Sequence, residues 1–478
     1  MGLSDGQSTP RLYSINPNRK TPVTVQIFAT RCPASSCRRG IVKFGLSLRQ
    51  TPPILLAMKR CILLLLALFS LSNTRASQPS GFYLHDGDRV VFYGDSITDQ
   101  RLYTTFTESY VLTRFPGMNV TFIHSGWGGD RVTGGGGGPI DVRLKRDVFA
   151  HHPTVMTIML GMNDASYKVF DQKVFDVYRK GYEHIVASLK ENLPGLRLTL
   201  IQPSPFDDVT REPGFEGGYN KVLIRYGEFV KDLAVQNGAN VADLNTAVVR
   251  ATEKANSKNT NAAIAFNPDR VHPGTAGQLL MAAELLKAWK APALVSDVEI
   301  DARGKKAVRN EGAEVSALQV DGAIQWTQLD AALPMPVSTN DPVMALAISC
   351  SDVLESLDRE MLKVTGLEAD SYSLKIDGKA VGKFTQQQLN EGVNLALVPT
   401  PMSKQAASVH NLTLRHNNIH FERWRSIQVP MAEHKNPRID AAVPPLLDAL
   451  DEEEARVIKE QRQTAQPTPH QFELTPAK

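Results

Sequence analysis

The sequence predicts an α/β fold, in which a parallel sheet with helices on both faces is followed by a C-terminal β-rich accessory region and terminal helices. Two observations support this prediction. Between residues 88 and 290, short apolar runs bounded by Gly, Pro or Asn alternate with longer segments of helical spacing, and such alternation is typical of parallel sheets. After Pro292 the pattern changes to short alternating runs separated by turn pairs such as Asp321-Gly322.

Five segments of the first region are expected to be strands. Each is short, apolar and bounded by turn residues, and in chain order they are Arg89–Tyr93, Val120–His124, Val155–Leu160, Leu196–Gln202 and Asn240–Asp243. Helical patterns cover roughly residues 100–115, 140–150, 171–192, 219–237 and 274–290. Ligands of such sheets bind beyond the carboxyl ends of the strands. We therefore expect the functional residues of a domain spanning 77–290 at that edge.

The chain beyond this domain is expected to have two parts. Residues 293–400 are predicted to form a β-rich accessory domain, in which Tyr372–Ile376 and Ala380–Phe384 flank an Asp-Gly turn and pair as a hairpin. Residues 401–478 are predicted to be a helical C-terminal segment with a disordered Pro/Thr/Gln-rich tail. Its helices are expected at about residues 403–428 and 446–463.

The N-terminal region has the pattern of an export signal. Residues 58–76 have a basic start, an apolar run from Cys61 to Leu71 and a small-residue exit near Ala76, as secretory signal peptides do. The run is too short for the ~20 residues of a membrane-spanning helix. The alternative to a signal peptide is a short buried helix. We expect Met58 to be the true start and residues 1–57 to be untranslated or a disordered leader, which predicts a periplasmic or extracellular protein.

Charge and cysteine content exclude some classes of function. Residues 1–76 hold 11 of the 53 Lys and Arg but one of the 50 Asp and Glu, so the rest of the chain has a net charge of −7. An acidic body argues against nucleic acid as a partner. Beyond residue 76 Cys350 is the lone cysteine, so the predicted domains contain no internal disulfide. No later segment is long and apolar enough to suggest a stable membrane span.

Two motifs suggest nucleophilic catalysis. Ser96 follows the first expected strand and precedes a helix, where unpaired N–H groups favour negative charge, although helix capping is an equally common use of such a serine. Asp269 stands three residues before His272, a spacing that allows the carboxylate to bond the far ring nitrogen and hold the tautomer that takes a proton from serine. Taken alone, this pair is more often a surface contact.

Two further motifs could supply hydrogen-bond donors for an oxyanion. Asn163 follows the third expected strand, and Gly129 follows the second, where a missing side chain lets substrate approach the backbone N–H. Either segment alone could be an ordinary loop. Because a parallel sheet collects the ends of its strands at one edge, all four motifs can meet there and provide the groups that acyl transfer needs.

The order and wide spacing of these motifs resemble the SGNH hydrolases, also called the GDSL esterase/lipase family, over about residues 86–290. Asp95-Ser96 resembles the first block, Gly129 the second, Gly161-x-Asn163-Asp164 the third and Asp269-x-x-His272 the last. His124 and Ser125 depart from the second block, where an asparagine is frequent. The resemblance implies a three-layer flavodoxin-like fold, no metal and no cofactor. It also implies a catalytic triad, oxyanion donors from Ser96, Gly129 and Asn163, and supporting roles for Asp95, Gly161 and Asp164.

The function expected from these features is that of a secreted serine esterase, acting on a small-molecule or polysaccharide ester. Export together with an accessory region favours a carbohydrate O-acetylesterase. The alternatives are a lipase or lysophospholipase and, in a different class, a non-catalytic carbohydrate-binding protein on a hydrolase scaffold. The five consecutive glycines at 134–138 are expected to be a flexible loop, because Pro139 prevents a dinucleotide-binding fingerprint. No particular oligomeric state is predicted.

Overall fold

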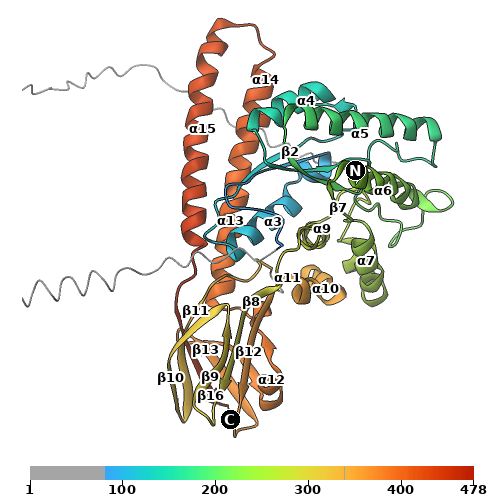
Figure 1. Ribbon diagram of the computed structural model, residues 1–478. Helices are drawn as coiled ribbons and strands as arrows, with labels where there is room; N and C mark the ends of the chain where they lie inside the picture. Colours follow the sequence, from blue (N-terminus) through green and yellow to red (C-terminus); the bar gives the residue numbers. More distant parts are fainter. Residues whose placement is uncertain (1–80, 338–339, 478) are drawn as a thin grey trace, which may run out of the picture. The chain divides into compact units, whose positions relative to one another are not determined.

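The computed structural model describes residues 81–337 and 340–477. Figure 1 follows the chain from a sheet with flanking helices, through a β-sandwich, along two long helices and back into the sandwich. The predicted leader (1–57) and signal peptide (58–76) lie outside the described residues. None of the helices in the described ranges combines the length and apolarity needed to span a membrane.

The first region is built on a five-stranded parallel sheet with the order β2-β1-β5-β6-β7. Its strands are β1 (Arg89–Gly94), β2 (Thr121–Gly126), β5 (Val155–Met159), β6 (Arg197–Ile201) and β7 (Asn240–Ala242). This is the flavodoxin-like order, and it confirms the predicted fold class. The chain changes direction between β1 and β5, so the crevice beyond the carboxyl ends of these two strands is the expected ligand site.

Helices cover both faces of the sheet, as predicted for an α/β fold (Figure 1). Neighbouring strand residues point to opposite faces: the Phe92 ring meets Tyr103 and Trp289 on one side, whereas Tyr93 faces Arg143 on the other. The first face carries α3 (Leu102–Arg114) and α9 (Thr275–Ala288). The second carries α4 (Ile140–Asp147), α5 (Gln172–Asn192) and α6 (Gly218–Asn237). The sequence did not predict α2 (Ser96–Asp99), α7 (Thr246–Lys258) or α8 (Thr260–Ile264).

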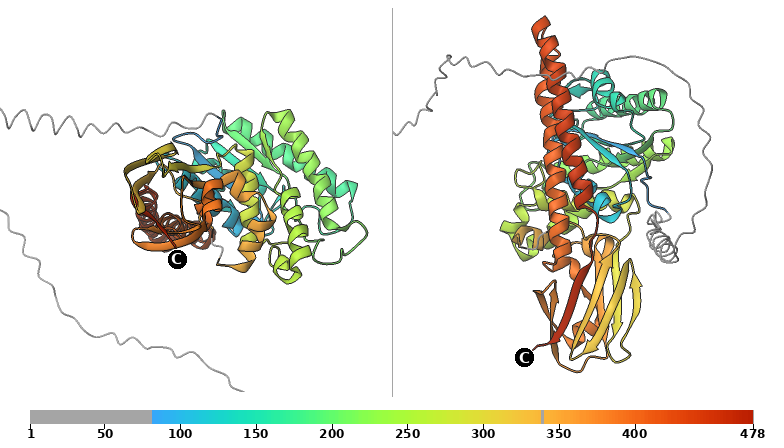
Figure 2. Two further views of the ribbon diagram at one scale, coloured as in Figure 1. Left: turned by 90° about the horizontal axis from the view of Figure 1, so that it is seen from below. Right: turned by 90° about the vertical axis from the view of Figure 1, so that its left-hand side faces the viewer.

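The β-rich region is a sandwich of two sheets with their own apolar core (Figure 2). One sheet has the order β15-β12-β8-β9 and the other β10-β11-β16-β13-β14. The strands are β8 (Leu294–Asp301), β9 (Lys306–Glu311), β10 (Ala313–Asp321), β11 (Ala323–Asp330), β12 (Arg359–Thr365), β13 (Ser371–Ile376), β14 (Lys379–Thr385) and β15 (Val393–Asn394). The predicted hairpin is β13–β14, with Tyr372 opposite Phe384 and Asp377-Gly378 in the left-handed region.

Short helices interrupt this β-rich region. They are α10 (Pro342–Cys350), α11 (Val353–Leu357) and α12 (Gln386–Glu391). The side chains of Met344, Ile348 and Leu357 belong to the core of the α/β region, and α10 and α11 pack against α7 and α9. The region from 293 to 400 is β-rich, as expected, but part of it is helical and packs on the first region.

The prediction of a disordered tail was wrong for residues His470–Pro476. These residues form β16, which pairs with β11 on one side and β13 on the other. Phe472 and Leu474 alternate into the sandwich core, and the Phe472 ring stacks on Trp326 at 4.9 Å. A strand that fills a gap between two others gains its hydrogen bonds only after the sheet has formed, and its own short pattern does not predict it.

Two long helices lead from the sandwich along the α/β region and back. Helix α13 (Pro401–Phe421) continues through the π-helical segment η3 (Glu422–Gln428) into α14 (Val429–Met431), and α15 (Pro437–Thr464) returns beside α13 (Figures 1 and 2). Helix α15 begins before the predicted residue 446 and contains Pro444 and Pro445. This part is largely exposed, so the carbonyl groups that lose partners to proline can reach solvent.

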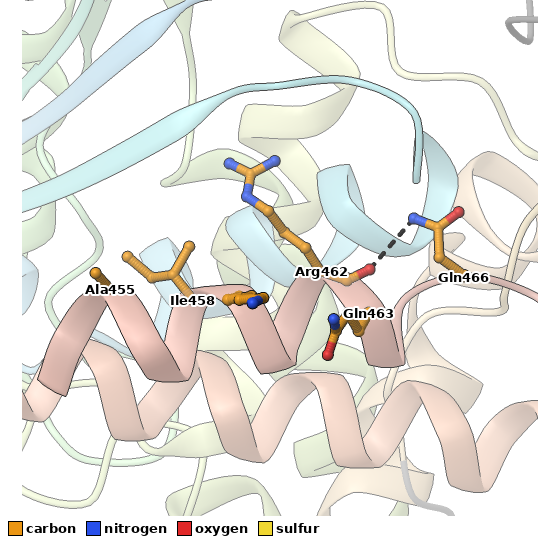
Figure 3. A pocket seen from close by; sticks show the side chains of 6 residues that line it. Ala455, Ile458, Arg462, Gln463 and Gln466 are labelled. Atoms are coloured by element: carbon orange, nitrogen blue, oxygen red, sulfur yellow. Dashed lines mark hydrogen bonds between the residues drawn. The ribbon is translucent and has the colours of Figure 1, made fainter. Parts of the chain in front are cut away.

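The end of α15 is held against the strand-β2 side of the sheet. The guanidinium of Arg462 donates to the carbonyl oxygens of Val120 at 2.6 Å and Met118 at 3.2 Å. Figure 3 shows Arg462 beside a hollow on α15, lined by Ala455, Ile458, Lys459, Arg462, Gln463 and Gln466. In the same view the Gln466 amide donates to the Arg462 carbonyl oxygen and closes the helix end.

A buried ionic cluster joins these helices to the α/β region. Glu108 on α3 accepts from His416 Nε2 at 2.6 Å and Gln461 Nε2 at 3.2 Å, and it lies 3.3 Å from His124 Nε2. Burial alone would raise the pKa of Glu108, but the His416 charge and the histidine hydrogen bonds lower it well below its ordinary value. Burial opposes the charge on His416, yet Glu108 and Glu454 raise the pKa of His416 to about 9. Glu108 and His416 therefore form an ion pair at neutral pH.

We expect His416→Gln to destabilise the protein by about 3 kcal/mol below pH 6.5, because it leaves a buried carboxylate without its counter-charge. The folded-state pKa of His416 is raised, so its contribution is fully present below the ordinary value of 6.5 and is lost as pH rises through about 9. Urea denaturation from pH 6 to 9.5 measures the difference between the two proteins, in which titrating groups outside this cluster cancel. The exposed His434→Gln is the control; a difference that stays constant with pH would contradict the ion pair.

Candidate active site

Ser96 lies at the switch point of the sheet, where β1 ends and α2 begins. Asp95 caps α2, since its Oδ1 accepts from the N–H of Ile97 at 3.0 Å. The capping function that the sequence left open for Ser96 thus belongs to Asp95, and the Ser96 hydroxyl is free for another partner. Its side chain is half-buried.

That partner is His272, on the loop before α9. His272 Nε2 lies 2.8 Å from Ser96 Oγ, and His272 Nδ1 lies 2.7 Å from Asp269 Oδ2. An ionised carboxylate only accepts, so Nδ1 carries the proton and Nε2 accepts from the serine hydroxyl. The three residues that the sequence singled out for acyl transfer are in direct contact.

The carboxylate of Asp269 is fixed by its own loop. Its Oδ1 accepts from the backbone N–H groups of His272 at 2.7 Å and Val271 at 2.9 Å. Partial burial acts to raise the pKa of Asp269, but the hydrogen bonds from His272 and Val271 outweigh it and lower the pKa. Asp269 is therefore ionised at neutral pH and holds the ring of His272 in one orientation.

The two predicted donor segments lie on loops near Ser96. A Cβ atom built on Gly128 would stand 3.9 Å from Ser96 Cβ, so the β2 loop runs directly past the nucleophile. The next residue, Gly129, has a left-handed φ of 79° and open space around it. On the β5 loop, Asn163 Nδ2 donates to the Asp130 carbonyl oxygen at 3.1 Å, which ties the two donor loops together.

Tyr167 is a site residue that the sequence did not indicate. Its hydroxyl donates to Asn163 Oδ1 at 3.0 Å, which orients the amide so that Nδ2 is the available donor. Ser166 and Tyr167 both have left-handed φ angles of 60° and 55°, an uncommon conformation for such residues that is often found at functional sites. The Tyr167 ring stacks on Tyr219 at 5.0 Å. No sequence pattern reveals two consecutive left-handed residues of this type.

The residues predicted to support the site stabilise the loops that carry it. Asp164 accepts from the N–H of Val132 at 2.9 Å, and burial raises the pKa values of Asp95 and Asp164 to about 7 each. Gly161 has a φ of 136°, and a Cβ atom there would stand 2.6 Å from the ring of Pro203. Asp95, Asp164 and Gly161 thus act on loop geometry, not through the hydroxyl–imidazole contact itself.

A second set of residues missed by the sequence is the buried cluster around Arg143. Its guanidinium donates to Asp130 at 2.7 Å, to Asp147 and to the Ser125 carbonyl oxygen. Asp130 directly follows Gly129, so Arg143 fixes the base of the donor loop. Trp424 Nε1, from the C-terminal segment η3, donates to Asp147 Oδ1 at 2.6 Å. No pattern in the sequence indicates that residue 424 reaches this cluster.

The described residues contain no group of three or more His, Cys, Asp or Glu side chains arranged to hold a metal ion. The two histidines one helical turn apart, His416 and His420, do not form such a site. His416 is committed to Glu108 and Glu454. The site chemistry is that of a hydroxyl, an imidazole and a carboxylate.

The prediction of a flexible glycine loop at 134–138 was wrong. The short strands β3 (Gly134–Gly135) and β4 (Gly138–Pro139) pair with each other, and the turn between them, Gly136 and Gly137, packs closely against Trp127 and Arg143. A Cβ atom on Gly137 would stand 2.5 Å from Arg143 Cδ and 2.8 Å from Trp127 Cδ2. Arg143 is held by several hydrogen bonds and has no room to move, so glycine is needed here for close packing.

We expect Gly137→Ala to cost about 1–3 kcal/mol of stability, the usual range for overpacking a tight interior. Urea denaturation at constant pH measures this loss. The matched control is Gly117→Ala, where an added Cβ atom meets nothing within 4 Å. Equal stability of the two variants would show that the glycine loop is looser than its packing indicates.

Comparison with known proteins gives a consistent result. The model of the GDSL-like lipase/acylhydrolase family matches residues 92–280. An acetylxylan esterase from Geobacillus stearothermophilus is 25% identical over 218 residues, which are 42% of this chain and 93% of that protein. The solved structure of a gut microbial diltiazem-metabolizing enzyme is 27% identical with a TM-score of 0.73, and covers 82% of this chain and 98% of that one. This similarity extends beyond the α/β region into the C-terminal parts.

Proposed function

Since residues 92–280 are a GDSL-like lipase/acylhydrolase domain of an ester-hydrolysing enzyme, we propose that Ser96 is its nucleophile, His272 its general base and Asp269 the residue that orients His272. The observation that carries this proposal is the continuous hydrogen-bonded chain from Ser96 Oγ through the imidazole to Asp269, with distances of 2.8 and 2.7 Å. A hydroxyl is a weak nucleophile until a neighbouring base removes its proton, and His272 Nε2 is in position to do so.

The proposed reaction has two stages. His272 takes the Ser96 proton as Ser96 Oγ attacks the ester carbonyl, and the imidazolium that forms is stabilised by ionised Asp269. His272 then gives this proton to the departing alcohol. Water, activated by the same imidazole, hydrolyses the acyl-enzyme and releases the acid.

We assign oxyanion stabilisation to the N–H groups of Ser96 and Gly129 and to Asn163 Nδ2. No hydrogen bond from the Gly129 N–H is found in the described part of the chain, so this donor is available to a developing negative charge. Loss of one such donor typically costs ~3 kcal/mol of transition-state stabilisation. Tyr167 contributes by keeping the Asn163 amide in the donating orientation.

Ser96→Ala should lower p-nitrophenyl acetate hydrolysis by about 10⁴-fold or more, because the acyl-enzyme can no longer form. Ser257→Ala, an exposed substitution on α7, is the control and should retain native activity. A fluorophosphonate probe should label the native protein and the control but not Ser96→Ala. Native rates from a folded Ser96→Ala protein would rule out the proposed nucleophile, and absence of labelling with absence of activity would favour the non-catalytic alternative.

For the substrate we propose an acetyl ester of a carbohydrate. Support comes from the acetylxylan esterase that aligns with the α/β region over 93% of its own length. The competing lipase-type function requires an apolar groove for a long acyl chain. The two functions differ in which acyl chain the enzyme accepts.

Among p-nitrophenyl esters, we therefore expect kcat/KM to be highest for acetate and at least about tenfold lower for octanoate. Without an apolar groove the added methylenes gain no binding energy, while the longer chain must still be ordered on the enzyme. Acetylated xylo-oligosaccharides should also release acetate. A preference for chains of eight or more carbons would instead support the lipase-type function.

A further inference from the structure

The C-terminal helix α13 ends beside α2, the helix that begins at Ser96. The guanidinium of Arg101, which joins α2 to α3, lies over the ring of Phe421 at 4.2 Å, and its Nη2 donates to Asn418 Oδ1 at 3.4 Å. Arg101 stands five positions after Ser96 in the sequence and also contacts Asp99 of α2, at 3.7 Å. The end of α13 therefore reaches the same edge of the sheet as the proposed active site.

The chain leaves this point as a π-helix, η3, which carries Trp424 and Arg425. Segments of π-helix are rare and are frequently found at functional sites. The buried Trp424 side chain bonds Asp147 of the Arg143 cluster, which fixes η3 on the α/β region. With η3 fixed in this way, the guanidinium of Arg425 lies over the Trp127 ring, 3.0 Å from its centroid.

Trp127 links Arg425 to the surroundings of Ser96. It precedes Gly128, whose N–H donates to Asp99 Oδ2 at 3.2 Å and whose added Cβ atom would stand 3.9 Å from Ser96 Cβ. Asp99 in turn interacts electrostatically with both Arg101 and Arg425. Arg425 thus belongs to a group of side chains around Gly128. Gly128 directly precedes Gly129, the proposed oxyanion donor.

The Arg425 guanidinium has unused hydrogen-bonding capacity. Within residues 81–337 and 340–477, no hydrogen bond or ion pair of this side chain is found; its contact is the stacking on Trp127. An arginine side chain has five N–H donors and can bind a carboxylate with two parallel bonds. Burial, together with the nearby charges of Arg143 and Arg146, lowers the pKa of Arg425, whereas Asp99 and Asp130 act to raise it.

We propose that Arg425 is a specificity residue of the active site, and that it binds a carboxylate carried by the ester substrate. The preferred substrate class is then an acyl ester of an acidic alcohol, such as an acetylated sugar acid, over the acetyl esters of neutral sugars. This inference rests on the proposed esterase function and deepens it. It assigns to the C-terminal segment a direct part in substrate recognition, through the guanidinium of Arg425.

A pair of acetyl esters tests the proposal in the full-length protein: 4-acetoxybenzoate, which carries a carboxylate, and its neutral methyl ester. We expect the ratio of kcat/KM for acid over neutral ester to fall roughly tenfold or more in Arg425→Gln, as for loss of a charge-assisted hydrogen bond. Arg425→Lys keeps the charge but not the two-pronged geometry and should retain part of the preference. The control Arg415→Gln removes the same charge from an exposed position on α13 and should keep the native ratio.

A binding measurement separates this inference from the proposed function. Calorimetry of 4-acetoxybenzoate with Ser96→Ala protein, with and without Arg425→Gln, does not depend on turnover, and weaker binding of the double variant is expected. If native protein hydrolyses neither ester, the esterase proposal fails and the binding comparison alone decides the role of Arg425. An unchanged kcat/KM ratio in Arg425→Gln, or equal affinity of the two Ser96→Ala proteins, overturns the carboxylate site.

Discussion

The buried guanidinium of Arg143 is the contact on which the geometry of the site depends. It is completely buried and holds Asp130, Asp147 and the Ser125 carbonyl oxygen at once, while its planar face lies near Tyr93 and Trp127. Those groups come from β1, from β2 and the loop after it, and from α4. A buried charge is stable only when such partners surround it, so the loop that carries Gly129 has one arrangement that satisfies Arg143.

Charged side chains on α3 also need partners, and they find them in the C-terminal part of the chain. Arg101 at its start contacts Phe421, Glu108 in its middle contacts His416, and Arg114 at its end bonds the carbonyl oxygens of Pro292 and Leu294. On an outer helix of an isolated α/β domain these charged residues would face solvent. Here α13 and the chain leading into the sandwich cover them. The C-terminal region is therefore an integral part of the packed molecule, and residue 425 can serve the active site because α13 is held along α3.

Much of the fold was predictable because it depends on local patterns. Buried parallel strands are short apolar runs between turn residues, and all five appear close to their predicted limits. The Asp377-Gly378 turn indicated its hairpin because that turn type needs left-handed residues. The predictions failed where long-range packing decides: β16 takes its hydrogen bonds from β11 and β13, which are distant in sequence, and Gly136 and Gly137 pack against Trp127 and Arg143.

For the site, local sequence patterns were enough to predict which groups are available and at which edge of the sheet they lie. Ser96, Asn163 and Gly129 follow strands, and Asp269 and His272 lie three residues apart, so a parallel sheet suffices to bring them near one another. The hydroxyl–imidazole distance, the orientation of Asn163 by Tyr167, and the positions of Trp424 and Arg425 near the site depend on how distant parts of the chain pack together. The physical reason is the separation in sequence between the interacting residues. Strand ends and tight turns are specified by neighbouring residues, whereas the partners of a buried charge can come from any part of the chain.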